Sequence, residues 1–223
     1  GVPRPDGNRE WLLDHGEAVA NWLREATGIR GCRLHSIGPR YRRVVLENPK
    51  QGDAVATSGC PVSLADEAPY LLTSTASLSD LRRRLFWKGH FRASRSVDMR
   101  RFRPNIVVTG TLPWEEDTWK RIRIGPVVFQ VWQRCARCLM TTFDRDTLRR
   151  DGALDVLRSF RERPGPGGNA STSVSNFGMH LVPVAGCPGD ISVGDTLEVL
   201  ERDPAREQEW LAKFGPRGKL SLR

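Results

Sequence analysis

The chain has 223 residues, of which 39% are hydrophobic and 27% are charged, and its formal net charge is +9 at pH 7. This balance fits a soluble globular protein with a buried core. No run approaches the roughly 20 apolar residues of a membrane helix, and the first twenty residues carry acids and lack the apolar centre of a signal peptide.

Three amphipathic helices are predicted along the chain. They span residues 14–26, 78–85 and 153–161, and each places its apolar residues at helical spacing. Asp14 with Glu17 resembles a capping pair for the first helix, and the S-x-x-D pattern that begins at Ser77 marks the start of the second. The residues expected to face inward are Ala18, Val19, Trp22, Leu23, Ala26, Leu78, Leu81, Leu85, Val156, Leu157 and Phe160.

Strands dominate the second half of the sequence. Seven short runs are rich in β-branched residues or alternate in polarity, which is typical of strands. They are "NIVVTG" (105–110), "KRIRIG" (120–125), "VVFQVWQ" (127–133), "CLMTTF" (138–143), "HLVPV" (180–184), "DISVGD" (190–195) and "TLEVL" (196–200). The Gly-, Pro- and Ser-rich stretch 163–176 is predicted to be a loop.

This order of elements favours a mainly β fold with peripheral helices, of the α+β class, over a parallel βαβ sheet. We expect residues 105–201 to form a closed or nearly closed β-barrel. Residues 1–104 are expected to be a helical, linking region and residues 202–223 a polar tail.

Most of the basic excess lies in one stretch. Between Arg82 and Arg103 there are nine Lys or Arg residues and one acid, Asp98, which gives a local balance of +8. Such a cluster suits an anionic partner such as phosphate, nucleic acid or an anionic membrane surface. The plainer interpretation is a solvated, mobile basic loop.

The cysteines indicate a reducing environment. Their number is odd and the chain is too large to need disulfide staples, so we expect free thiols in an intracellular compartment, cytoplasmic or mitochondrial. They are Cys32, Cys60, Cys135, Cys138 and Cys187.

Only Cys135 and Cys138 are close in sequence, in "RCARCLMTTFD". A zinc half-site would need a second ligand pair, and a thioredoxin-like pair would need a helix after the first cysteine. The pair could also form a structural disulfide, or consist of two buried, inert cysteines. The neighbouring Arg134 and Arg137 would stabilise a thiolate, which is the form that bonds a soft metal.

Several segments together resemble the MOSC domain, named for the C-terminal domain of molybdenum cofactor sulfurases. The order and spacing of the segments match that family over about residues 16–200, and the combination is specific although each piece alone is weak. The segments are "ADEAPYLLTSTASLSDL" (65–81), "FRPNIVVTG" (102–110), "WEEDTWKRIRIG" (114–125), "CARCLMTTFDRDT" (135–147), "LRSFR" (157–161), "NFGMHLVP" (176–183) and "ISVGDTLEVL" (191–200).

The resemblance implies a MOSC-type β-barrel that holds a molybdenum–molybdopterin cofactor (Moco). In that family one protein cysteine completes the coordination of the metal, and by motif position this catalytic and metal-binding residue is Cys138. The residues implied to contact the cofactor are Asp66, Arg103, Asn105, Ala136, Arg137 and His180, with Glu67 and Ala68 near the pterin. An arginine fork suits the pterin phosphate, and an asparagine amide suits the edge of a pterin ring.

The sequence departs from the family pattern at several places. Family members carry further strands and basic cofactor-binding residues upstream of Gly1, so the barrel is expected to lack its N-terminal strands. Ala136 stands where serine is usual in the amidoxime-reducing branch, and the link from Phe86 to Arg101 is longer than usual. His180 stands where related enzymes often carry Tyr or Asn.

Two functions from this resemblance remain open. The first is an oxidoreductase that reduces small N-hydroxylated substrates with electrons from a haem or flavin partner, since no G-x-G-x-x-G fingerprint occurs here. The second is a non-redox carrier or sulfuration module that works with a pyridoxal-phosphate-dependent cysteine desulfurase. A third possibility does not depend on the resemblance: the chain could be a barrel that binds nothing, or an RNA-binding protein that uses the basic stretch. Nucleic acid is not the expected partner.

Overall fold

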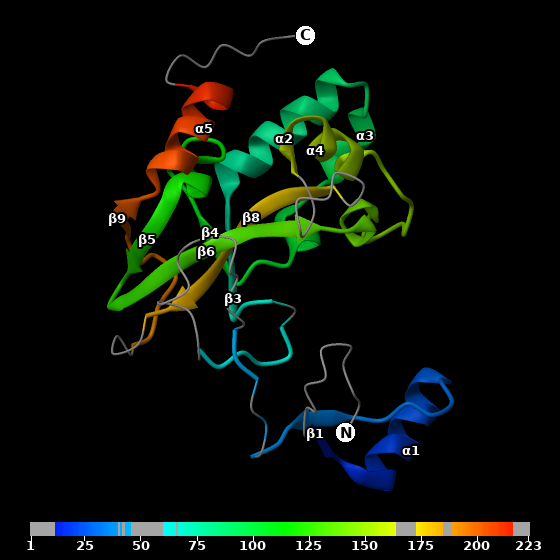
Figure 1. Cartoon of the computed structure of the whole chain (residues 1–223). Helices are drawn as coiled ribbons and strands as arrows, with labels where there is room; N and C mark the ends of the chain where they lie inside the picture. Colours follow the sequence, from blue (N-terminus) through cyan, green and yellow to red (C-terminus); the bar gives the residue numbers. More distant parts are fainter. Residues whose placement is uncertain are drawn as a thin grey trace. The chain divides into compact units, whose positions relative to one another are not determined.

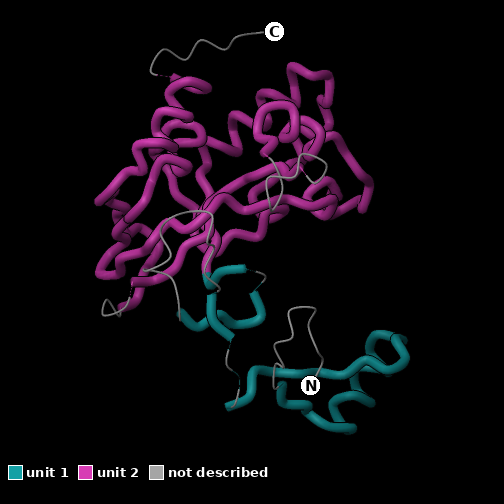
Figure 2. The backbone as a smooth tube through the Cα atoms, viewed as in Figure 1, with its two compact units in different colours: residues 1–69 teal, residues 70–223 magenta. Residues whose placement is uncertain are grey.

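The computed structural model describes residues 12–39, 41, 43–45, 60–65, 67–163, 173–184 and 189–215. The chain forms two compact units, residues 1–69 and residues 70–223, which Figure 2 shows in two colours. Among the described residues no helix reaches the length and apolarity of a membrane span.

The first unit contains one helix and a two-stranded ribbon. Strand β1 (Leu12–Asp14) pairs antiparallel with β2 (His35–Ile37), and α1 (Gly16–Thr27) lies between them in the chain. The predicted helix is confirmed, and Gly28 ends it in a left-handed conformation. The predicted inner face is wrong, because Ala20 is the buried residue of α1 and Trp22 is largely exposed.

The second unit is built on a curled sheet of seven strands, with helices on the outside (Figure 1). The strand order is β4-β3-β8-β6-β5-β9, and β7 pairs with β8 beside this path. All pairs are antiparallel except β3 with β4. The strands are β3 (Tyr70–Ser74), β4 (Ile106–Val108), β5 (Trp119–Ile124), β6 (Val127–Arg137), β7 (Glu162–Arg163), β8 (Val174–Pro183) and β9 (Leu197–Arg202).

The helices of the second unit cover the sheet. Helices α2 (Thr75–Trp87), α3 (Phe91–Ser96) and α4 (Ala153–Arg161) lie together, and α4 contacts β8 (Figure 1). Helix α5 (Pro204–Phe214) contacts the short turn η2 (Glu115–Thr118). The fold is therefore the expected β sheet with peripheral helices.

Two apolar clusters hold the unit together. One lies between the helices and the sheet and contains the predicted stripe of α2, which is fully or nearly fully buried. The other lies inside the curled sheet, where alternate residues of β5, β6 and β8 meet, among them Ile122, Val131 and Met179. This alternation follows the two-residue period of a strand, so the inward positions are continuous from strand to strand.

Gly178 is required where β8 passes β3. Its φ is +81°, and a Cβ atom there would lie 2.6 Å from the carbonyl oxygen of Leu72. Glycine can adopt this conformation without the steric cost that a side chain brings.

Several predicted elements are wrong in detail. Residues 138–143 do not form a strand; Leu139–Thr142 form a 3-10 turn, η3, because Thr141 and Thr142 hydrogen-bond back to carbonyls three residues earlier. Residues 190–195 form a turn rather than a strand. Helix α2 begins at Thr75 with Ser74 as its cap, three residues before the predicted start.

Two further segments differ from the expectation. The basic stretch is not a loop, because α3 and a second 3-10 turn, η1 (Met99–Phe102), occupy it. The predicted loop 163–176 overlaps β8, which begins at Val174, and its residues 164–172 lie outside the described residues, as does Cys187.

Candidate functional site

The C-x-x-C pair is divided between the interior and the surface. Cys135, within β6, is buried, and its thiol donates a weak hydrogen bond to the Ala136 carbonyl at 3.6 Å. Cys138 follows the last residue of β6 and is exposed. All four cysteines in the described part of the chain are free thiols, so the pair forms no disulfide.

The turn after Cys138 fixes its backbone. The Cys138 carbonyl accepts hydrogen bonds from the Thr141 amide at 3.2 Å and from the Thr141 hydroxyl at 3.0 Å. The thiol itself contributes to no hydrogen bond among the described residues. The strand end therefore presents a sulfur atom to solvent from a tightly held backbone.

Arg137 ties this strand end to two other segments. Its Nε and Nη2 donate to the Phe177 carbonyl at 2.9 and 2.6 Å, and its Nη1 donates to the Phe102 carbonyl at 3.0 Å. The guanidinium also lies 5.6 Å from the centre of the Phe102 ring. Only the planar fork of an arginine can reach both carbonyls at once.

The Phe102 carbonyl precedes a strained residue. Arg103 has φ 53° and ψ 46°, the left-handed region, which costs a residue with a side chain about 1–2 kcal/mol. Its amide donates to the Arg100 carbonyl at 3.2 Å, and its side chain is exposed. Within the described part of the protein the Arg103 guanidinium has no hydrogen-bond or ion-pair partner. Such strain is concentrated at functional sites.

Asn105 is anchored on one side and open on the other. Its backbone amide donates to the Leu71 carbonyl at 2.9 Å, and its Oδ1 accepts from the Leu71 amide at 2.9 Å. The Nδ2 group makes no hydrogen bond to any residue that the structure describes. The amide is therefore oriented by the fold while both donors of Nδ2 stay available.

The turns that carry these residues lie against each other. The turn η1, which ends just before Arg103, contacts η3, which begins just after Cys138. The hydrogen bond from Arg137 to the Phe102 carbonyl also joins the end of β6 to η1. The Cys138 thiol and the Arg103 guanidinium flank these two turns, and neither forms a hydrogen bond among the described residues.

Of the other predicted site residues, His180 and Ala136 lie in the sheet and Asp66 lies outside the described residues. His180 is buried in β8, where it pairs with Leu71 across the sheet and its ring lies 6.3 Å from that of Trp132. Because Asn105 also bonds to Leu71, His180 and Asn105 lie in one row of the sheet, separated by one strand.

Ala136, two residues before Cys138, is exposed. Asp66 lies outside the described residues. Glu67 is exposed and Ala68 is buried, and both belong to the first unit.

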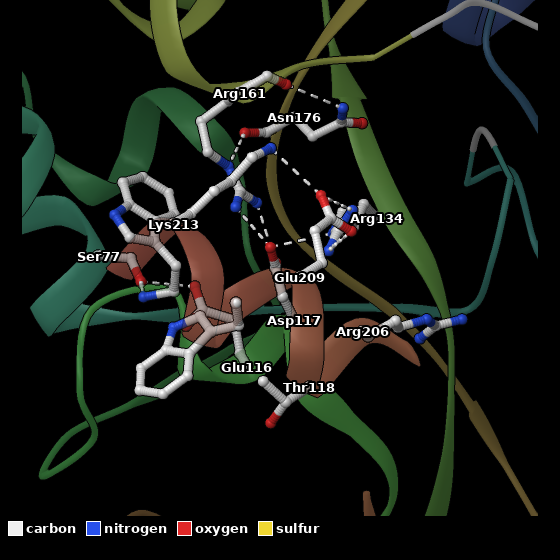
Figure 3. Close-up of polar contacts among 12 residues, drawn as sticks. Ser77, Glu116, Asp117, Thr118, Arg134, Arg161, Asn176, Arg206, Glu209 and Lys213 are labelled. Atoms are coloured by element: carbon white, nitrogen blue, oxygen red, sulfur yellow. Dashed lines mark hydrogen bonds and ion pairs between the residues drawn. The ribbon is translucent and has the colours of Figure 1, made fainter. Parts of the chain in front are cut away.

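Sequence reasoning missed the charged network that holds β6 in place. Asp117 is buried between two guanidinium groups: Arg161 donates to both of its oxygens, and Arg134 Nε lies 3.0 Å from its Oδ2 (Figure 3). Arg134 also pairs with Glu209 of α5 at 3.0 Å. Burial raises the pKa of Asp117, but Arg161 and Arg134 outweigh it, and the pKa lies below its ordinary value. Arg134 therefore serves the interior, and its charge is matched by carboxylates there.

Glu116, next to this network, is a protonation site. It is fully buried and accepts a hydrogen bond from the Ser77 hydroxyl at 2.7 Å. Burial and the neighbouring Asp117 carboxylate raise the pKa of Glu116 to about 7 from its ordinary 4.5. Because this carboxyl group is fully buried, it supports the fold and is not part of the exposed surface at Cys138.

The surface beside Cys138 is apolar. Leu139 and Met140 are the next two residues, and 50% and 71% of their surface is exposed. An apolar border of this kind favours contact with the uncharged part of a small molecule. In the described residues there is no cluster of three or more His, Cys, Asp or Glu side chains that could hold a metal ion.

One known protein family matches more than half of this chain. The family model described as "MOSC domain" matches residues 60–198. Mitochondrial amidoxime-reducing component 1 of Mus musculus is 33% identical over 189 residues, which cover 84% of this chain and 52% of that protein.

Two other proteins are similar to this chain over a large part of its length. Mitochondrial amidoxime reducing component 2 of Homo sapiens is 41% identical over 154 residues, 66% of this chain and 42% of the relative. Molybdenum cofactor sulfurase of Oryza sativa subsp. japonica is 33% identical over 164 residues, 71% of this chain and 20% of the relative. The chain thus spans about half the length, or less, of the relatives it matches.

Proposed function

The chain belongs to the MOSC domain family, and we propose that it binds a molybdenum–molybdopterin cofactor, with the Cys138 thiolate as the protein ligand of the metal. The observation that carries the proposal is the contact between the turns η1, which Arg103 follows, and η3, which Cys138 precedes. The Cys138 thiol, the Arg103 guanidinium and the Nδ2 group of Asn105 form no hydrogen bond among the described residues.

The donor set fits such a group. A thiolate is a soft ligand, so the exposed Cys138 would supply one protein ligand to a molybdenum ion that the cofactor itself would hold. The Arg103 guanidinium would bind the pterin phosphate through paired, charge-assisted hydrogen bonds. The Asn105 Nδ2 would donate to the pterin ring, because its Oδ1 is already bonded to Leu71.

Arg137 is proposed as a positioning residue. Its guanidinium is bonded to the Phe102 and Phe177 carbonyls, so it holds the Arg103 turn against the Cys138 turn. Ala136 and the buried His180 complete the set of proposed cofactor contacts. For Asp66, Glu67 and Ala68 the proposed contact with the pterin rests on the family resemblance alone.

For the reaction we propose reduction of small N-hydroxylated substrates. The bound cofactor supplies two-electron redox chemistry at molybdenum, and this chain supplies the metal ligand, the orientation of the cofactor and the apolar border formed by Leu139 and Met140. The names of two of the relatives, amidoxime-reducing components, support this reaction. Electrons would come from a separate haem or flavin protein.

A carrier role is the second candidate. It is favoured by the similarity to molybdenum cofactor sulfurase and by the segment "FGMHL" (177–181), which stands where "FGQ" would favour the reductase. The chain would then receive or hold the cofactor for sulfuration by a pyridoxal-phosphate-dependent cysteine desulfurase. For either role we propose a reducing intracellular compartment, cytoplasmic or mitochondrial, supported by the free cysteines and by the relatives' names.

Metal analysis tests the cofactor proposal. The purified protein should contain molybdenum near one atom per chain, Cys138→Ala should lose it, and Cys135→Ala and Cys32→Ala should keep it. Equal molybdenum content in Cys138→Ala and the parent would refute the ligand assignment. Turnover of an amidoxime with an artificial electron donor then separates the two roles, because a carrier would bind molybdenum without turnover.

A further inference from the structure

The corner between α2 and α3 carries an exposed aromatic cluster that neither the fold nor the cofactor site uses. Phe86, Trp87 and Phe91 are 45%, 64% and 55% exposed. The ring centres of Phe86 and Trp87 are 5.6 Å apart, and those of Phe86 and Phe91 are 5.1 Å apart, both edge to face. Three large apolar side chains therefore form one contiguous surface feature, which soluble proteins rarely leave uncovered.

The corner is a firmly built part of the fold. Leu85 and Ala93, on its two sides, are buried in the core between the helices and the sheet. Gly89 makes the turn with φ +81°, and the His90 amide donates to the Leu85 carbonyl at 2.9 Å. The His90 ring lies so close to Gly152 that a Cβ atom there would be 2.4 Å from it. The aromatic rings thus face outward on a fixed support.

The charge around this corner is uncompensated. Elsewhere in the same basic stretch, Arg83 and Arg84 pair with Asp80, and the buried Arg101 pairs with Asp144 and Asp151. By contrast, no carboxylate of the described residues pairs with Lys88, Arg92 or Arg95, and the contact found for Arg92 is a neutral one, 3.5 Å to the Thr147 hydroxyl. The cations that no carboxylate neutralises therefore lie in the same segment of the chain as the exposed aromatic rings.

We propose that this corner docks the protein onto an anionic lipid bilayer. Trp and Phe side chains enter the boundary between headgroups and acyl chains, and Lys and Arg beside them are attracted to anionic lipids. The edge-to-face packing leaves no row of open parallel rings on which the bases of a nucleic acid could stack. The chemistry that matches both the rings and the cations is a bilayer surface that contains phosphatidylserine or another anionic lipid.

Vesicle sedimentation of the full chain tests the proposal. Vesicles of phosphatidylcholine with phosphatidylserine should bind the protein, and vesicles of phosphatidylcholine alone should bind it much more weakly. The double variant Lys88→Glu with Arg92→Glu should bind at least about thirtyfold more weakly, since loss of each cation near the surface removes roughly a fivefold gain and the two new carboxylates are repelled by the anionic lipids. Trp87→Ser with Phe91→Ser should lose binding even at low salt, where charge attraction is strongest.

Matched controls separate docking from general charge and hydrophobicity. Arg30→Glu with Arg121→Glu makes the same change in net charge at exposed residues that do not belong to the corner, and Trp22→Ser removes another exposed tryptophan. Both should bind vesicles as the parent does. An unchanged thermal unfolding midpoint would show that the corner variants are folded.

Three results would overturn the proposal. The first is equal binding of the parent to neutral and anionic vesicles. The second is undiminished binding after removal of Trp87 and Phe91, which would leave only attraction to any polyanion. The third is tight binding to an RNA oligonucleotide or an acidic protein that depends on the same side chains while anionic vesicles are not bound.

Discussion

Removal of Asp117 should destabilise the second unit more than any exposed charge does. The carboxylate is buried and bonds to both Nη groups of Arg161, with Arg134 Nε 3.0 Å away. Asp117→Ala therefore leaves two buried guanidinium groups without their shared partner. Loss of one partner from a buried ion pair costs about 3–5 kcal/mol. Among the described residues Glu209 pairs directly with Arg134 but forms no ion pair with Arg161, so most of this cost falls on Arg161.

Urea unfolding followed by circular dichroism measures this effect. The free energy of unfolding should fall by about 3–5 kcal/mol in Asp117→Ala with an unchanged slope. Asp117→Asn, which keeps the shape but not the charge, should fall by a smaller amount. The control is Asp155→Ala, because Asp155 is 77% exposed, 3.7 Å from Arg158, and such a pair contributes less than about 1 kcal/mol. A loss below about 1 kcal/mol in Asp117→Ala would refute the role assigned to the network.

Three further predictions concern protonation, positioning and backbone conformation. The pKa of Glu116 is about 7 in the folded state and 4.5, its ordinary value, in the unfolded state. Between pH 4.5 and 7 the folded protein therefore keeps a proton on Glu116 that the unfolded chain has lost, so the free energy of unfolding should fall as pH rises through this range. Glu116→Gln should remove this fall; an unchanged pH profile of urea unfolding would contradict it. Arg137→Lys cannot hold both the Phe102 carbonyl and β8, and it should weaken cofactor retention about tenfold, as measured by molybdenum lost on dialysis; full retention would count against a positioning role. Gly178→Ala should lower the free energy of unfolding by more than Gly110→Ala. Both glycines have positive φ, but only at Gly178 would a Cβ atom meet a carbonyl oxygen, that of Leu72. Equal losses in the two variants would show that the contact with Leu72 relaxes.

Local patterns predicted the elements whose stabilising contacts are close in sequence. The helix at residues 153–161 was placed with its observed bounds, and the β5–β6 hairpin follows from alternation interrupted by Gly125 and Pro126. Strand β3 was missed, because five residues before a helix carry too little pattern to separate a strand from the helix start. The turn after Cys138 was predicted as a strand because its threonines are β-branched, whereas their hydroxyls hydrogen-bond locally and close a turn.

The site was predictable only as a set of residue types. The sequence singles out Cys138, Arg103 and Asn105 through their motifs, and no pattern shows that Cys135 is buried while Cys138 is exposed. The partners of Asp117 could not be read from the sequence either, because Arg161 is 44 positions away and the pairing depends on how η2, α4 and β6 meet. The available signal is Arg134, an arginine that follows the apolar run of β6, and the sequence alone suggests it as a neighbour of the thiol rather than as part of an interior network.

X-ray absorption at the molybdenum edge tests the central claim most directly. If Cys138 completes the coordination, the loaded protein should show three sulfur neighbours at molybdenum: two from the dithiolene and one from the chain. Cys138→Ser reconstituted with the same cofactor should show two, and Cys135→Ser should still show three. Three sulfur neighbours in Cys138→Ser would contradict the assignment of this thiolate as the metal ligand.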